Sequence, residues 1–151
     1  MAGRVRFLDE SHSVIFTDKG IQFFSTRVET SPELVSQIPI EENIRSITYA
    51  QDKVGIVTDN VEGGDPYKLR IYDREGSPVF EKTFNYQYTG FDIDGDLVLL
   101  YNDSSCKVYN MTGTEKYNGT FDFTVSKVSA GRFPGTLLVM GPQKMTEIKL
   151  Q

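Results

Sequence analysis

The stretch LRIYDREG at residues 69–76 decides the fold, because the chain nearly repeats it 37 positions later as KVYNMTG at residues 107–113. The segments that follow correspond in the same way, with VFEKTF at residues 79–84 and KYNGTF at residues 116–121. A repeat of roughly 40 residues built from short apolar runs is typical of propeller-type arrays.

The same spacing extends over the whole chain. The four strongest apolar strands are centred at Ile15, Ile56, Leu99 and Val139, and they are 41, 43 and 40 residues apart. No segment has the i, i+3, i+4, i+7 apolar spacing that a helix requires. The sequence therefore predicts a single all-β domain over residues 1–151, a propeller-type array of about four antiparallel four-stranded units whose last unit is incomplete. A β-sandwich, which also has many short strands at regular spacing, is the alternative.

The incomplete last unit would leave an open sheet edge, and open edges pair with other strands. Either the first strand returns to complete the fourth unit, or two chains associate, so we expect a monomer or a homodimer through open sheet edges. The expected strands are residues 5–8, 13–17, 21–26, 33–40, 44–49, 54–58, 68–72, 79–84, 88–93, 97–101, 106–109, 115–121, 123–128, 136–140 and 145–150.

The composition is that of an ordinary globular protein, with a formal net charge of −5. Lys and Arg are scattered, whereas a sequence-independent nucleic-acid binder needs a basic stripe. We therefore expect no nucleic-acid partner. Insertion of this chain into a membrane is not expected either, because it has no apolar span of about 18 residues.

Cys106 is the only cysteine, so the chain cannot form an intrachain disulfide. In the context SSCKVY it is interpreted as a small, half-buried strand residue, and a functional thiol is the alternative. His12 is the only histidine, so the chain has few residues from which to build a zinc site or a Ser–His–Asp arrangement.

Two segments, residues 72–128 and 131–150, resemble the C-terminal part of the DUF5711 family, uncharacterised proteins of Firmicutes. The features that carry the resemblance are YDREG, LLYNDSSCKVY and the closing LLVMGP. The resemblance implies a propeller-like β-repeat domain, no known activity or cofactor, and an extracytoplasmic parent protein tethered by one N-terminal membrane-spanning helix.

The most tempting motif is DIDGD, in which Asp92, Asp94 and Asp96 surround a glycine. Three carboxylates suit a hard cation such as Ca²⁺, but an EF-type loop needs the order D-x-D-x-D-G and a distal Glu. Asp-Gly is also a common hairpin turn. We interpret the motif as a turn and keep a weak ion site as the alternative.

The loop Gly131–Gly135 carries Arg132 and Phe133 and is a reasonable contact point for a partner, because binding residues are often found on loops. The first functional hypothesis is a non-enzymatic binding or scaffold module that presents loops to a protein or a surface polymer. The alternative is a carboxylate-based glycan hydrolase, which would need two acids brought together from different repeats. No pair of acids is singled out by its spacing.

Overall fold

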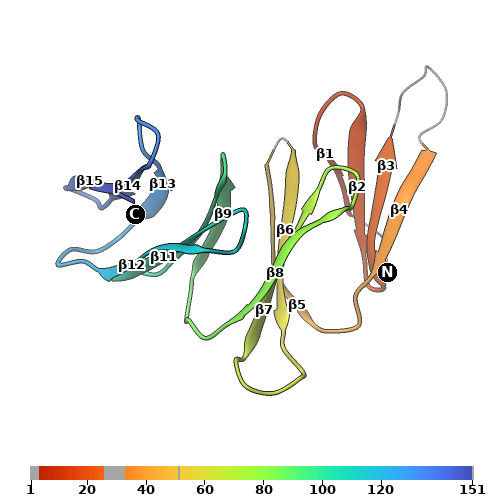
Figure 1. Ribbon diagram of the computed structural model, residues 1–151, viewed down its shortest axis with the longest axis horizontal. Coiled ribbons are helices and arrows are strands. Elements are labelled where there is room, and N and C mark those ends of the chain that lie inside the picture. The colour runs from red at the N-terminus through yellow and green to blue at the C-terminus, as the bar shows by residue number, and fades with distance from the viewer. Residues whose placement is uncertain (1–3, 26–32, 51, 151) are drawn as a thin grey trace. The chain divides into compact units, whose positions relative to one another are not determined.

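The computed structural model describes residues 4–25, 33–50 and 52–150 and shows only strands and connecting turns in these ranges (Figure 1). The strands form four antiparallel sheets, each made of strands consecutive in the chain. None of the sheets closes into a barrel, and the predicted all-β propeller-type array is confirmed. The strands are β1 (Arg4–Phe7), β2 (His12–Thr17), β3 (Gly20–Ser25), β4 (Glu33–Pro39), β5 (Ile44–Tyr49), β6 (Lys53–Asp59), β7 (Tyr67–Asp73), β8 (Pro78–Phe84), β9 (Gly90–Asp94), β10 (Leu97–Tyr101), β11 (Ser105–Asn110), β12 (Glu115–Thr120), β13 (Lys127–Ala130), β14 (Thr136–Met140) and β15 (Met145–Lys149).

The chain divides into two compact units, Met1–Asn85 and Tyr86–Gln151. The first holds the sheets β1-β2-β3-β4 and β5-β6-β7-β8. The second holds the four-stranded sheet β9 to β12 and the three-stranded sheet β13-β14-β15. Among the described residues the fourth sheet therefore has one strand fewer than the other three, as the sequence predicts.

The repeated turn owes its shape to the same side-chain hydrogen bonds in both copies. Asp73 Oδ1 accepts bonds from the backbone N–H groups of Glu75 and Ser77, and Asn110 Oδ1 accepts bonds from those of Thr112 and Thr114. Each turn also contains a glycine with positive φ, Gly76 in the first copy and Gly113 in the second. Glycine is favoured at these positions because it adopts the left-handed backbone conformation without steric cost. An Asp or Asn followed three positions later by Gly thus forms equivalent turns in two repeats.

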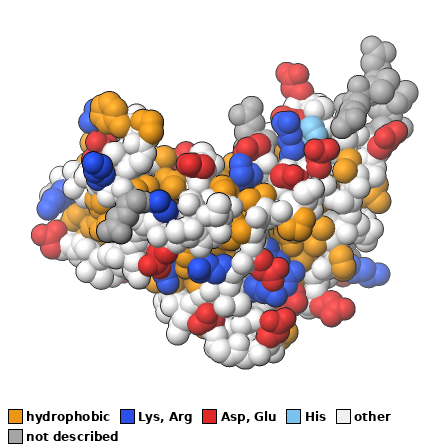
Figure 2. All heavy atoms as spheres, in the orientation of Figure 1, with side chains coloured by type: hydrophobic (Ala, Val, Ile, Leu, Met, Phe, Trp, Pro, Cys, Tyr) orange, Lys and Arg blue, Asp and Glu red, His pale blue; other side chains and the backbone are white. Residues whose placement is uncertain are grey.

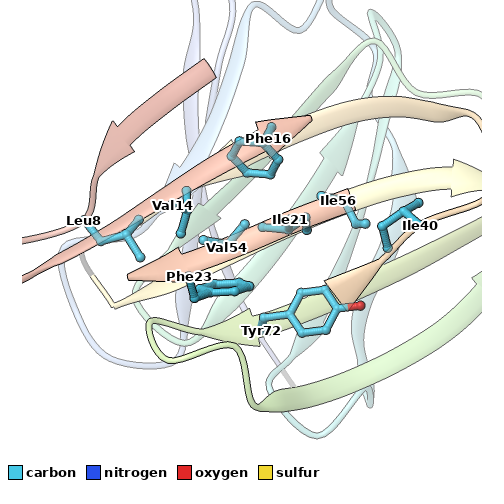
Figure 3. Close-up of a cluster of buried hydrophobic side chains, with 9 residues drawn as sticks. All are labelled: Leu8, Val14, Phe16, Ile21, Phe23, Ile40, Val54, Ile56 and Tyr72. Carbon is cyan, nitrogen blue, oxygen red and sulfur yellow. The ribbon is translucent and has the colours of Figure 1, made fainter. Parts of the chain in front are cut away.

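The core of the first unit lies between its two sheets (Figure 3). The register pairs Val14 with Phe23 and Phe16 with Ile21, so these four side chains share one face of the first sheet. They form one buried cluster with residues of the second sheet, and the rings of Phe23 and Tyr72 lie 6.1 Å apart between centroids. The whole cluster is Leu8, Val14, Phe16, Ile21, Phe23, Ile40, Val54, Ile56 and Tyr72.

The core of the second unit is built in the same way from its two sheets. Leu99 and Val108 of one sheet and Leu137 and Val139 of the other are fully buried in one cluster. The Asp94 carboxylate links the same two sheets, because its Oδ2 accepts a hydrogen bond of 2.9 Å from the backbone N–H of Ala130.

Two expectations about strands are wrong. Residues 123–128 were expected to form a strand, but β13 begins only at Lys127. The preceding segment is instead bonded to the loop before β11, since the N–H of Val125 donates to the carbonyl of Asp103 at 2.9 Å. The first strand does not complete the fourth sheet either, because β1 pairs with β2 and lies at the edge of the first sheet.

Candidate functional site

A groove in the first unit lies between the edge strands β1 and β5 of its two sheets. Its volume is about 310 Å³. Five of its lining residues come from β5 and one from β1: Arg6, Ile44, Arg45, Ser46, Ile47 and Tyr49. We call this feature the β1–β5 groove.

Strand alternation directs Arg6 towards the groove. Arg6 is paired with Val14, a core residue, so it lies on the face of the first sheet that meets the second sheet. Val5 and Phe7 lie on the opposite face, where they are 50% and 81% exposed. The Arg6 guanidinium stands 5.5 Å from the centre of the Tyr49 ring, and its Nε donates a 3.4 Å hydrogen bond to the Tyr49 hydroxyl. Among the described residues Arg6 has no carboxylate partner.

Arg45 reaches the groove because of a β-bulge. The register of β5 against β6 shifts between Ile44 and Ser46, so Arg45 is the extra residue. A bulge changes the direction of the side chain it carries. The Nε of Arg45 lies 2.6 Å from Oδ1 of Asp59, which orients a side chain that is still 51% exposed.

The floor of the groove is apolar and packs against the core of the first unit. Ile44, Ile47 and Tyr49 all pack against the buried cluster of the first unit, and Phe16 meets the Tyr49 ring edge-on at 5.6 Å. The groove therefore combines two guanidinium groups, two hydroxyl-bearing side chains and an apolar floor. Its lining includes no carboxylate, although the chain as a whole carries a net charge of −5.

The three aspartates of DIDGD take part in a hairpin. Asp92 and Asp94 belong to β9, whereas Asp96 is exposed in the two-residue turn after it, where Gly95 has φ of +62°. The interpretation as a turn is confirmed. In the part of the chain that the structure describes, no three His, Cys, Asp or Glu side chains gather in a way that could hold a metal ion.

His12 belongs to a polar cluster with Asp9, Ser11 and Arg74. The His12 Nδ1 lies 2.9 and 3.1 Å from the two carboxylate oxygens of Asp9 and 3.0 Å from the Ser11 hydroxyl. In a catalytic triad the acid and the serine contact different ring nitrogens. Here both contact the same nitrogen, so this arrangement is not that of a triad.

The cluster links the two sheets of the first unit. Arg74, in the turn after β7, donates a 2.9 Å hydrogen bond to Asp9 Oδ2. The backbone N–H of Ser11 and the side chain of His12 hold the pKa of Asp9 well below its ordinary value of 3.8. Its folded pKa is depressed, so its stabilising effect is present above pH 3.8 and is lost as the pH falls below that value.

Replacing Asp9 with asparagine should therefore flatten the acid dependence of stability. We expect the urea midpoint of the wild-type protein to fall as the pH drops below about 4, and the midpoint of Asp9→Asn to fall less steeply, because an amide does not titrate. Urea denaturation followed by circular dichroism over this range measures both slopes. Equal slopes would show that the titration of Asp9 does not contribute to the acid dependence of stability.

Cys106 is fully buried in the core of the second unit. Burial raises the pKa of its thiol to about 12, so the reactive thiolate is not formed near neutral pH. The interpretation as a strand residue is confirmed, since Cys106 lies in β11. The expected half-burial is wrong, because the side chain faces the core of the second unit and has no exposed surface.

We expect Cys106 of the native protein to react with a thiol reagent at pH 8 at least about a hundredfold more slowly than the same residue in denaturant. The rate can be followed by the absorbance of the released chromophore. Rapid labelling of the native chain would contradict the burial of this side chain.

The loop between β13 and β14 places Arg132 and Phe133 on the surface, where the Arg132 side chain is 79% exposed and Phe133 is 62% exposed. The Arg132 guanidinium stands 5.9 Å from the centre of the Phe133 ring and 3.7 Å from a carboxylate oxygen of Glu147. The sequence correctly places both on an exposed loop; their contact with a partner stays a prediction.

Sequence reasoning missed the β1–β5 groove. Arg6 and Arg45 belong to different repeats, and nothing in their local sequence indicates that the strands carrying them meet. The bulge that redirects Arg45 has no glycine to signal it.

Basic and acidic side chains are interspersed on the visible surface, which shows no continuous basic stripe over the described residues (Figure 2). Within the described ranges no helix has the length and apolar character that a membrane crossing requires.

Comparison with known proteins gives a family and a fold. The profile described as "Family of unknown function (DUF5711)" matches residues 1–150, so the likeness covers the first half of the chain as well as the second. No curated protein matches the chain in sequence.

Three solved structures are similar in fold. A computationally designed protein, Ika4, has 9% identity and a TM-score of 0.56, and the match covers 95% of this chain and 88% of that one. Hsv2 of Kluyveromyces lactis has 10% identity and a TM-score of 0.55, covering 99% of this chain and 47% of that one. A functionally unknown protein from Desulfotomaculum acetoxidans has 14% identity and a TM-score of 0.53, and the match covers 98% of this chain and 54% of that one. The chain thus spans about half the length of the two natural proteins, and these likenesses show the fold alone.

Proposed function

Because the chain belongs to the DUF5711 family, whose function is unknown, we propose from its own geometry that it is a non-enzymatic binding module for a protein or a surface polymer. The observation that carries the proposal is the β1–β5 groove. It combines an exposed Arg6, which has no carboxylate partner in the described residues, with apolar side chains that pack against the core of the first unit. A concave surface of this kind, with a few polar groups over an apolar base, is typical of binding sites.

The chemistry of the described residues supports binding more than catalysis. The groove lining offers no carboxylate as general acid or base. The buried Cys106 is held as a thiol, and the pKa of Asp9 is lowered, whereas a general acid needs a raised one. No observation favours a glycan hydrolase, so we do not propose it as a second function.

The Arg132–Phe133 pair is the second surface through which the module would contact a partner. An arginine beside an exposed aromatic ring is a combination enriched in binding hot spots. The expected Firmicutes origin and the extracytoplasmic, membrane-tethered parent stay predictions.

The full chain can be tested against a panel of acidic and neutral polysaccharides and acidic peptides by biolayer interferometry. We expect reversible binding of at least one member, which is recovered at its original length. Chromatography of the recovered ligand provides the second readout. Shortened ligand would support a hydrolase, and the absence of binding across the panel would overturn the proposal.

A further inference from the structure

We propose that the β1–β5 groove binds a carboxylate-bearing sugar, a single uronic acid unit of an acidic polysaccharide. The inference rests on the proposed binding function and names the ligand of that site. It follows from the charge, the remaining lining and the size of the groove.

The charge of the lining selects an anion. Arg6 and Arg45 are the charged residues of the groove. Arg45 is ion-paired with Asp59, whereas Arg6 has no carboxylate partner among the described residues, so Arg6 supplies the uncompensated charge. Arg45 is oriented by Asp59, which holds its Nε, whereas Arg6 is oriented by the Tyr49 ring and hydroxyl. Both guanidinium groups are therefore positioned before a ligand arrives, which lowers the entropic cost of binding. A planar carboxylate matches the fork of an arginine.

The uncharged lining selects among carboxylates. Ile44 and Ile47 offer an apolar surface, and Ser46 and Tyr49 carry hydroxyl groups beside it. A uronic acid has a carboxylate, several hydroxyls and an apolar C–H face, so it can use all three parts of the lining. A glutamate side chain has no hydroxyls for Ser46 and Tyr49, and inorganic phosphate has no apolar surface for the two isoleucines.

The size of the groove is sufficient for one sugar unit. A volume of about 310 Å³ is at the lower end of the range of small-molecule sites. A polymer would therefore place one uronate in the groove and continue beyond it.

The direct test is isothermal titration of the full chain with trigalacturonate, a short chain of uronic acid units. Galactotriose is the neutral control of the same ring type, and triglutamate and inorganic phosphate are anionic controls. We expect trigalacturonate to bind at least tenfold more tightly than each control, because only it satisfies the charged, hydroxyl-bearing and apolar parts of the groove.

Three variants locate the site. Arg6→Gln should weaken trigalacturonate binding roughly tenfold or more, and Arg6→Lys should weaken it severalfold, because lysine keeps the charge and loses the fork. Lys144→Gln is the matched control: Lys144 also stands over an aromatic ring, at 5.2 Å from the centre of Phe123, and does not line the groove. It should bind as the wild type does. Unchanged thermal unfolding of each variant excludes a folding defect.

Two results would overturn the assignment. Equal affinity for triglutamate or phosphate would show that the groove selects charge and not a sugar acid. Wild-type affinity in Arg6→Gln would show that the sugar binds elsewhere. Either result leaves the binding-module proposal standing if another ligand of the panel binds, so the two proposals fail separately.

Discussion

Replacing Phe23 with alanine is expected to lower the free energy of unfolding of the first unit by about 3–5 kcal/mol, the usual cost of truncating a fully buried phenylalanine. Phe23 has no exposed surface, and its ring lies beside Tyr72 of the second sheet (Figure 3). The truncation would leave a cavity where the two sheets meet, and the backbone of a paired strand cannot move in to fill it.

Phe7→Ala is the matched control, because it removes the same side chain from a position that is 81% exposed. We expect its effect to stay within about 0.5 kcal/mol. Urea denaturation followed by far-UV circular dichroism measures both variants. Similar effects at the two positions would mean that the packing between the sheets of the first unit is not as described.

Replacing Gly20 with alanine should lower the free energy of unfolding by roughly 2–5 kcal/mol, because the cost of backbone strain adds to that of a steric clash. Gly20 has φ of +146°, which side-chain-bearing residues rarely adopt. A Cβ at this position would also lie 2.0 Å from the carbonyl oxygen of Ile38 and 2.9 Å from Cα of Pro39. Both contacts are with the backbone of β4, so relief would require separating β3 from β4.

Gly95→Ala distinguishes the contribution of the close contact from that of backbone strain. Gly95 also has a positive φ, of +62°, but nothing lies within 4 Å of the position its Cβ would take. We expect a loss of about 1 kcal/mol, the strain of the left-handed conformation alone. Thermal and urea unfolding of the two variants side by side give the difference. A Gly20→Ala protein as stable as Gly95→Ala would contradict the close approach of β4.

The sequence by itself determined the strands and their turns. The run of residues 97–101 and that of residues 136–140 are predicted with their true ends, and the Asp73 and Asn110 turns follow from their repeated pattern. These features are local, because alternation and turn chemistry act over a few neighbouring residues. Residues 123–128 were misassigned because Phe123 and Val125 alternate with polar residues, which is typical of a strand. The backbone N–H of Val125 instead donates a hydrogen bond to the carbonyl of Asp103 in another loop.

Only the tertiary structure decided which side chains meet. Arg6 lines a groove with Arg45, and Asp9 contacts Arg74, although each pair comes from different repeats. Their local sequences resemble those of ordinary surface strands and turns. The pairing of charges depends on distances between sheets, and these are set by the packing of Phe23, Tyr72 and their neighbours in the core. Local sequence patterns therefore could not predict the candidate site, because a binding surface forms where separate strands approach one another.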